Sequence, residues 1–335
     1  MEHICIKCKH STENDTYYDE NKKHYIDPVL FSPIVTVLFN IINDFMTKLY
    51  QKLIKSCPSE TDIKKGLNKI SSFSPSEADK HLLMSILNVI DLTSLNTTDN
   101  RSQIIHFTGK VNSFSGRYSN IPNIAAICVF PNFVSVVKEK LTAKNVKIAA
   151  VAGAFPTSQT FRSIKVTECK MAIEAGADEI DIVIPVGAFL GNDFAAVADE
   201  IKEIKAAIGE KQLKVIVESG LLGDYEHIFN ASMIAMDAGA DFIKTSTGKT
   251  PVSATPEAAF VMCRAISDFY SETGIRVGFK AAGGIVSAAD AINYYQIVNH
   301  CLGQEWLNNS LFRIGASRLA NNILSEISGC RIDHF

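Results

Sequence analysis

The stretch Ala175-Gly-Ala-Asp-Glu-Ile-Asp-Ile-Val-Ile184 predicts a helix end followed at once by a strand. Its glycine can take the left-handed conformation that ends a helix, and the residues after it are mostly β-branched. The same Ala-Gly-Ala-Asp sequence returns at residues 238–241, directly before the apolar run Phe242-Ile-Lys-Thr-Ser246. The two copies indicate helices that end where strands begin, as in a parallel α/β sheet.

Short β-branched runs recur on both sides of this stretch, and segments with helical periodicity separate them. The runs span residues 88–93, 125–130, 146–151, 179–184, 213–217, 242–246, 277–280 and 312–315. Such alternation implies parallel strands joined by crossover helices, and eight units fit a (β/α)8 TIM barrel. A doubly wound open sheet is the alternative, but the glycine-rich nucleotide-binding fingerprint is missing after the first strand.

Three helices between the runs have clear sequence signals. An apolar stripe from Phe194 to Ile208 predicts one amphipathic helix. Thr255 before Pro256 predicts the start of another, because threonine caps helices and proline suits their first position. Ser287 with Asp290 resembles a capping box, with aspartate in place of the usual glutamate.

The N-terminal 82 residues differ from this pattern, and we expect them to form an extension to a barrel domain over residues 83–330. Residues 1–27 are polar and lack periodicity, residues 31–55 have helical spacing, and a polar linker precedes another helix near Ser76. The uncharged part near residues 28–43 is too short and interrupted to span a membrane. We expect the extension to cap the barrel or to build a homo-oligomer interface. Residues 331–335 form a short C-terminal tail.

The composition is that of an ordinary globular protein, with 47% hydrophobic and 21% charged residues among 335. A net charge of -3 gives no electrostatic case for nucleic acid or for an anionic membrane as a partner. The eight cysteines are not spaced as a disulfide framework, and no signal peptide is recognisable, so we expect a cytoplasmic protein. Cys5 and Cys8 lack a second pair with metal spacing, so we expect no metal and no cofactor.

Polar side chains inside otherwise apolar strands are the candidates for chemistry, because TIM barrels react at the C-terminal ends of their strands. They are Asp91, Cys128, Asp181, Lys244 and Lys280. Two of these candidates have simpler alternatives: Asp91 could bond the barrel backbone, and Cys128 could be a small core residue. Lys244 could also extend its charge to the strand end.

Lys244 and Lys280 lie on consecutive strands of the predicted barrel. Burial and a neighbouring ammonium both disfavour a charged lysine, so each should lower the pKa of the other. A fall from about 10.4 to about 7–8 corresponds to ~4 kcal/mol and yields a neutral amine at physiological pH. Such an amine is suited to forming a Schiff base with a carbonyl, and Asp181 could accept and return protons.

Glycine-bearing loops follow the last three predicted strands. Gly248 and Lys249 follow the sixth strand, Gly283 and Gly284 the seventh, and Gly315 with Ser317 the eighth. Each glycine alone is typical of a plain turn. Three such loops beside two buried lysines instead favour a phosphate site built from backbone N–H groups.

Five segments of the chain closely resemble the deoxyribose-phosphate aldolase family. They are Asp91-Leu-Thr-Ser-Leu-Asn96, Glu179-Ile-Asp-Ile-Val183, Phe242-Ile-Lys-Thr-Ser-Thr-Gly-Lys249, Val277-Gly-Phe-Lys-Ala-Ala-Gly-Gly284 and Arg313-Ile-Gly-Ala-Ser317. The resemblance runs from about residue 83 to about 325, in order and with fitting spacing. It implies a class I aldolase that interconverts 2-deoxyribose 5-phosphate with acetaldehyde and glyceraldehyde 3-phosphate, in deoxyribonucleoside catabolism.

The resemblance also implies roles for single residues. Lys244 would form the Schiff base, Lys280 would lower its pKa, and Asp181 would take part in proton relay. The positions that match those holding the substrate phosphate in the family are Gly248, Lys249, Gly283, Gly284, Gly315 and Ser317. We also expect Asp91, Cys128 and Thr245 to contribute to substrate binding.

Three departures from the family pattern stand out: Ala281 replaces a usual proline, Arg318 replaces a small residue, and the tail at His334-Phe335 lacks tyrosine. Two other functions are compatible with the pattern. One is a non-catalytic sugar-phosphate sensor, and the other is a transaldolase-like Schiff-base enzyme that acts on longer sugars.

Overall fold

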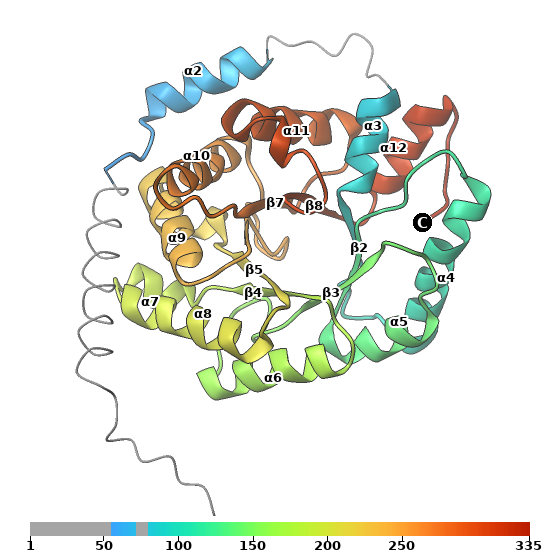
Figure 1. Cartoon of the computed structure of the whole chain (residues 1–335), viewed down its shortest axis with the longest axis horizontal. Coiled ribbons are helices and arrows are strands. Elements are labelled where there is room, and N and C mark those ends of the chain that lie inside the picture. The colour runs from blue at the N-terminus through green and yellow to red at the C-terminus, as the bar shows by residue number, and fades with distance from the viewer. Residues whose placement is uncertain (1–54, 72–79) are drawn as a thin grey trace, which may run out of the picture. The chain divides into compact units, whose positions relative to one another are not determined.

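The computed structural model describes residues 55–71 and 80–335. The helix expected within residues 31–55 therefore falls almost wholly outside the described residues, as do Cys5 and Cys8. The described residues form eight strands, and at least one α-helix separates each strand from the next (Figure 1).

Eight parallel strands close into a barrel in chain order. Their bounds are β1 Ile90–Thr93, β2 Ala126–Val129, β3 Lys147–Val151, β4 Glu179–Val183, β5 Gln212–Ile216, β6 Phe242–Lys244, β7 Gly278–Ala282 and β8 Phe312–Ala316. β8 pairs with β1 in parallel, with Asp91 opposite Gly315, and this pairing completes the circle. The predicted TIM barrel is confirmed, and every strand overlaps its predicted run.

Helices surround the barrel in Figure 1, because each crossover must pack its apolar face on the outside of the sheet. The α-helices are α2 Glu60–Ser71, α3 Lys80–Asn88, α4 Arg101–Arg117, α5 Val134–Lys140, α6 Arg162–Glu174, α7 Val186–Leu190, α8 Phe194–Ile208, α9 Tyr225–Asp237, α10 Pro256–Thr273, α11 Ala288–Leu302 and α12 Leu319–Ser328. Three short 3-10 helices join them: η1 Pro131–Phe133, η2 Ser219–Leu221 and η3 Gln304–Trp306.

The helix signals in the sequence are confirmed at these positions. α8 has the predicted bounds, the Thr255 hydroxyl accepts from the Ala258 N–H at 3.1 Å, and Ser287 forms the capping box with Asp290. Gly176 and Gly239 both have positive φ, as expected where a helix gives way to a strand.

The polar linker expected after residue 55 is wrong, because α2 lies there. Ser59 caps this helix, because its hydroxyl accepts from the Asp62 N–H at 3.2 Å. Ile63 and Ile70 form a buried face of the helix, and its charged residues lie on the exposed face. The helix contacts α10 and α11, and Gly66 lies so close to the Phe260 ring that a methyl group would clash. Only a few apolar residues form this face, which is why composition alone suggested a linker.

The inside of the barrel has two different sides. Strands β2 and β3 contribute small apolar residues, and Leu95 packs with them; this cluster contains Leu95, Ala126, Cys128, Ala149 and Val151. The remaining strands contribute charged residues to the inside of the barrel.

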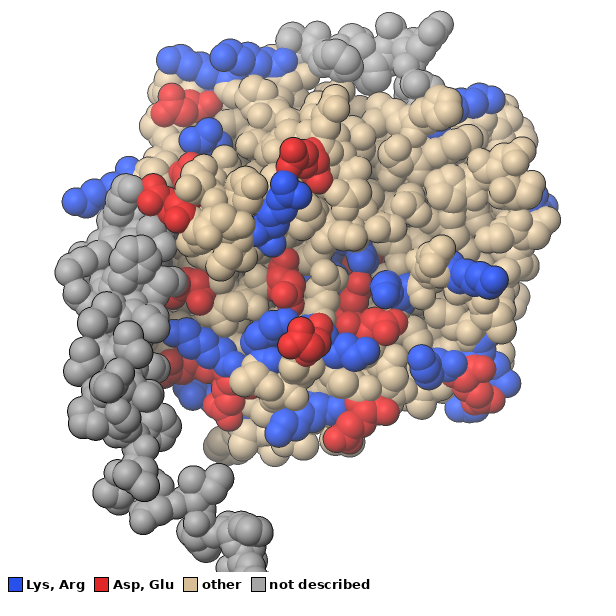
Figure 2. Space-filling view, viewed as in Figure 1, with Lys and Arg blue, Asp and Glu red and all other residues tan. Residues whose placement is uncertain are grey.

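In the part of the chain that the structure describes, no helix combines the length and hydropathy needed to cross a bilayer. Acidic and basic side chains alternate over the face in Figure 2, and neither sign forms a continuous patch.

Candidate active site

Neighbouring strands bring the predicted lysines together. Lys244 on β6 lies opposite Lys280 on β7 in the sheet register, and Asp181 on β4 lies two strands away from Lys244. Both ammonium groups donate to the same oxygen, Oδ2 of Asp181, each at 2.8 Å. The three residues are at most 4% exposed, so this oxygen joins the two lysines inside the barrel.

The two lysines respond oppositely to their surroundings. Burial lowers the pKa of Lys244, and the charge of Lys280 lowers it further, while Asp181 only partly opposes them. Lys280 is also buried, but Asp181 and Asp91 together outweigh burial and raise its pKa. The reduction expected for both lysines therefore holds for Lys244 and is wrong for Lys280, because Lys280 has a second carboxylate. Lys280 stays charged beside an amine that loses its proton more readily.

Asp91 belongs to the same ionic group rather than to the substrate pocket. It accepts from Lys280, and its other oxygen accepts from Arg313 at 2.5 Å. Burial alone would raise the pKa of Asp91, but these two cations outweigh it and hold the pKa below its usual range. The bonds of the Asp91 carboxylate are to cations, so the alternative of a backbone tie does not apply to its side chain.

A pocket of about 210 Å³ opens beside Lys244 at the C-terminal ends of the strands. Its lining contains most of the predicted substrate-binding residues: Gly248, Lys249, Gly283, Gly284, Gly315 and Ser317, together with Thr93, Leu95, Asn96, Thr247 and Ala282. The predicted loops after β6, β7 and β8 thus converge on one cavity. Arg318 is exposed and does not line it.

Glycine is required where the loops after β6 and β7 meet. Gly248 and Gly283 both have positive φ, and a methyl group on Gly283 would lie 2.6 Å from Ser253 and 3.1 Å from the Gly248 Cα. Within the described residues, the backbone N–H groups of Gly248, Gly283 and Gly284 have no hydrogen-bond acceptor. Three free N–H groups and the Lys249 ammonium make this pocket suitable for an anion.

Besides Asp91, two further predicted binding residues lie away from the pocket lining. Thr245 is fully buried, and its hydroxyl donates to the Ala282 carbonyl and accepts from the Ala282 N–H, so it ties β6 to β7. Cys128 is buried in the apolar cluster, and burial raises the pKa of its thiol. Ala281 is fully buried in β7, next to Lys280.

Sequence reasoning missed four charged residues around this site. Glu179, Lys214 and Arg313 are buried in strands and join the ionic group, and their signal was the same as that of Lys244: a charge inside an apolar run. Glu218, just after β5, is the fourth. Its carboxylate accepts from the Thr247 hydroxyl at 2.5 Å and from the Thr247 N–H, and so holds the loop that carries Gly248 and Lys249.

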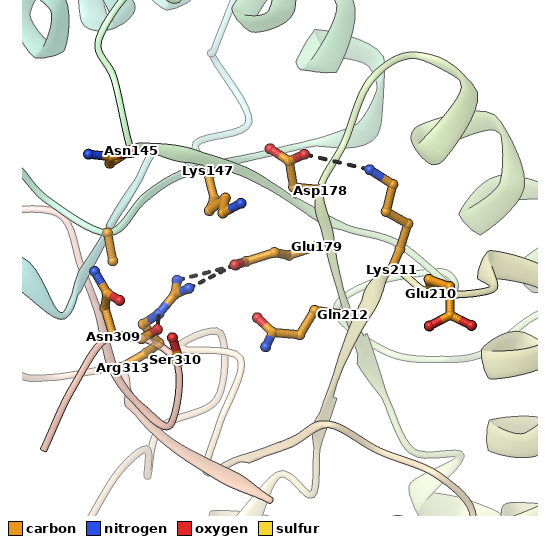
Figure 3. A pocket seen from close by; sticks show the side chains of 11 residues that line it. Asn145, Lys147, Asp178, Glu179, Glu210, Lys211, Gln212, Asn309, Ser310 and Arg313 are labelled. Atoms are coloured by element: carbon orange, nitrogen blue, oxygen red, sulfur yellow. Dashed lines mark hydrogen bonds and ion pairs between the residues drawn. The ribbon is translucent and has the colours of Figure 1, made fainter. Parts of the chain in front are cut away.

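A larger pocket of about 320 Å³ lies at the opposite mouth of the barrel, where β3, β4, β5 and β8 begin (Figure 3). Charges of both signs line it, including Lys147, Asp178, Lys211 and the Glu179–Arg313 pair. Because TIM barrels carry out their chemistry at the C-terminal ends of the strands, we assign the candidate site to the smaller pocket beside Lys244.

Comparison with known proteins agrees with this geometry. The model of the DeoC/LacD family of aldolases matches residues 85–295. The chain belongs to this family. Human deoxyribose-phosphate aldolase is 42% identical over 255 residues, which cover 73% of this chain and 80% of the human protein. Deoxyribose-phosphate aldolase of Bos taurus is 41% identical over 255 residues, which likewise cover 73% of this chain and 80% of the bovine protein. A solved aldolase named QR15 is 31% identical, covers 72% of this chain and 96% of its own, and superimposes with a TM-score of 0.59.

Proposed function

We propose that this DeoC/LacD family member is a class I aldolase that cleaves 2-deoxyribose 5-phosphate to glyceraldehyde 3-phosphate and acetaldehyde, reversibly. The observation that carries the proposal is the position of Lys244. It is the lysine with a lowered pKa, it lines the glycine-loop pocket, and a charged lysine and a carboxylate flank it. The names of the human and bovine relatives support the same substrate.

The reaction follows from these contacts. The neutral Nζ of Lys244 attacks the sugar aldehyde, and loss of water leaves an iminium ion. Deprotonation of the C3 hydroxyl then breaks the C2–C3 bond, and the electron pair moves into the iminium to form an enamine. Protonation of the enamine at C2 and hydrolysis release acetaldehyde and restore the amine. Asp181 Oδ2, which accepts from both lysines, can pass protons between Lys244, Lys280 and bound water.

The phosphate of the substrate would occupy the pocket formed by Gly248, Lys249, Gly283, Gly284 and Ser317. Free N–H groups and one ammonium match a dianion, and Lys244 lines the same pocket, so one small sugar phosphate could reach both. In this proposal the enzyme acts in the breakdown of deoxyribonucleosides in the cytoplasm. The free thiols of Cys57, Cys128, Cys169, Cys263, Cys301 and Cys330, all within the described residues, support a reducing compartment.

Reduction with borohydride in the presence of deoxyribose 5-phosphate tests the proposal. We expect a covalent adduct on Lys244, mapped by mass spectrometry, and neither adduct nor turnover in Lys244→Ala. Fructose 6-phosphate serves as the control substrate, because a transaldolase-like enzyme would cleave it and a deoxyribose-phosphate aldolase would not. An adduct on another lysine, or full turnover by Lys244→Ala, would contradict the mechanism.

A further inference from the structure

A continuous ionic group runs through the inside of the barrel from the candidate site to the opposite mouth. Its members are Asp91, Glu179, Asp181, Lys214, Lys244, Lys280 and Arg313. Lys214 Nζ bridges two of the acids, at 2.5 Å from Glu179 and 3.1 Å from Asp181. Arg313 bridges Glu179 to the third acid, at 2.7 Å from Glu179 and 2.5 Å from Asp91. No member is more than 4% exposed.

The group contains four basic side chains and three acidic ones. Buried charges are tolerated when opposite charges compensate them, so one excess positive charge is costly in this interior. Loss of one proton removes the excess. Arg313 cannot lose a proton in a protein, Lys280 donates to two carboxylates, and Lys214 also lies between two. Lys244 contacts one carboxylate, whose oxygen it shares with Lys280.

We propose that Lys214, Glu179 and Arg313 are positioning residues whose charges balance the barrel interior, so that Lys244 is the member that becomes neutral. The inference rests on the proposed function only in taking Lys244 as the nucleophile. It assigns a role to residues outside the lining of the candidate substrate pocket: Glu179 and Arg313 line the opposite mouth of the barrel, and Lys214 joins Glu179 to Asp181.

The charges that face this group elsewhere add no net imbalance. At the opposite mouth, Figure 3 shows the Glu179–Arg313 pair, and the flanking side chains there are two bases, Lys147 and Lys211, and two acids, Asp178 and Glu210. Asp178 pairs with Lys211 at 3.6 Å. Near the site itself, the Lys249 ammonium adds one positive charge and the Glu218 carboxylate one negative charge. The Cys128 thiol also faces Lys244, and burial raises the pKa of that thiol, which keeps it neutral. The balance is therefore decided by the seven members.

Two single substitutions should shift the activity profile in opposite directions. Lys214→Gln removes a cation, so Lys244 should hold its proton more strongly, and the acid limb of kcat/KM against pH should move up by about one unit. Glu179→Gln removes an acid, so the same limb should move down by about one unit. A residue that only supports the fold would reduce activity without moving the limb. Shifts in the same direction, or none in either variant, would overturn the proposal.

Charge-preserving variants keep the test decisive if a single variant does not fold. Lys214→Arg keeps the cation, and the double variant Lys214→Gln/Glu179→Gln removes one charge of each sign. Both should retain the wild-type position of the acid limb, even where kcat falls. A displaced limb in both of them would overturn the proposal.

The protonation state of Lys244 can also be measured by chemical labelling, without the sugar substrate. Reductive methylation by formaldehyde and cyanoborohydride proceeds through the neutral amine, so its pH dependence at Lys244, followed by mass spectrometry, should shift as the activity does. If the wild type failed to cleave deoxyribose 5-phosphate, the proposed function would be refuted. The methylation series would still support or refute the charge balance.

Discussion

At the scale of single residues, Lys244 and Lys280 show how neighbours decide the chemistry of identical side chains. Both are buried and both donate to Asp181 Oδ2. Lys280 has Asp91 as a second carboxylate, and its pKa rises, whereas the pKa of Lys244 falls. Lys244, the proposed nucleophile, is thus distinguished from Lys280 by having fewer anions near it, not by deeper burial.

Lys249 lies only five residues after Lys244 and should act on the phosphate alone. Its ammonium donates to the Leu95 carbonyl at 2.5 Å across the mouth of the pocket, within the lining that faces Gly283 and Gly284. We expect Lys249→Ala to raise KM for deoxyribose 5-phosphate roughly ten- to a hundredfold, the loss of one charged hydrogen bond, with kcat little changed. Steady-state kinetics measure both constants.

Lys211→Ala is the matched control for this prediction, because it removes one positive charge at the opposite mouth of the barrel. Its KM should equal that of the wild type. A fall in kcat for Lys249→Ala without a change in KM would place Lys249 in the chemical step instead.

The main residues of the site could be predicted from the sequence because charge inside an apolar strand is conspicuous. Lys244, Lys280 and Asp181 were found in this way, and the glycine loops followed from their places after the strands. Glu179 and Arg313 carry the same signal but lie near the N-terminal ends of their strands, where a barrel is not expected to react. Lys214 lies one strand from Asp181, and only the register brings them together.

At the scale of elements, the loop after β6 depends on the turn after β5. Glu218 has a φ of 54°, a left-handed conformation that costs a non-glycine residue about 1–3 kcal/mol, and the residue is 1% exposed. Among the described residues it has no cationic partner; instead it accepts from Thr247 and, at 3.4 Å, from the Thr250 hydroxyl. No sequence pattern predicts such a contact, because it joins residues of two loops that lie 29 positions apart in the sequence.

Glu218→Gln should therefore weaken substrate binding without touching substrate. The amide keeps the size of the side chain but turns a donor toward the Thr247 N–H or hydroxyl, so the loop that carries Gly248 loses its anchor. We expect KM to rise about five- to tenfold, equivalent to one neutral hydrogen bond, with a smaller change in kcat.

Glu168→Gln provides the comparison, since Glu168 accepts a backbone N–H from Ala154 at 2.8 Å in the loop after β3 and does not line the phosphate pocket. Its KM should stay at the wild-type value. Equal effects of the two substitutions would show that Glu218 has no special link to the pocket.

At the scale of the whole molecule, the barrel was predictable because eight alternating units leave few other topologies. α2 was not, because its stability comes from packing on α10 and α11, including the contact of Gly66 with Phe260, rather than from a strong pattern of its own. The expectation that residues 1–82 cap the barrel or build a homo-oligomer interface stays a prediction.

The ionic group should also make the stability of the barrel depend on pH. Asp91 and Asp181 have pKa values below their usual range, despite burial, because cations surround them. A carboxylate with a depressed pKa stabilises the fold fully above its unfolded pKa of about 3.9 and loses that effect as the pH falls through the folded value. Lys214 and Lys280, whose pKa values are raised, stabilise it below about 10.4 and lose the effect at higher pH.

Asp91→Asn tests this linkage. The variant leaves Lys280 and Arg313 short of one carboxylate, so at pH 7 the free energy of unfolding, measured by urea denaturation, should fall by about 3–5 kcal/mol. The difference from the wild type should shrink as the pH falls below about 3.9, because Asp91 is then protonated in the unfolded wild-type chain while the folded chain still holds it ionised. Glu139→Gln, which removes an exposed acid paired with Arg101, should change stability little at any pH. If the Asp91→Asn difference stayed constant from pH 7 to pH 3, the ionised carboxylate would not be the source of the stability.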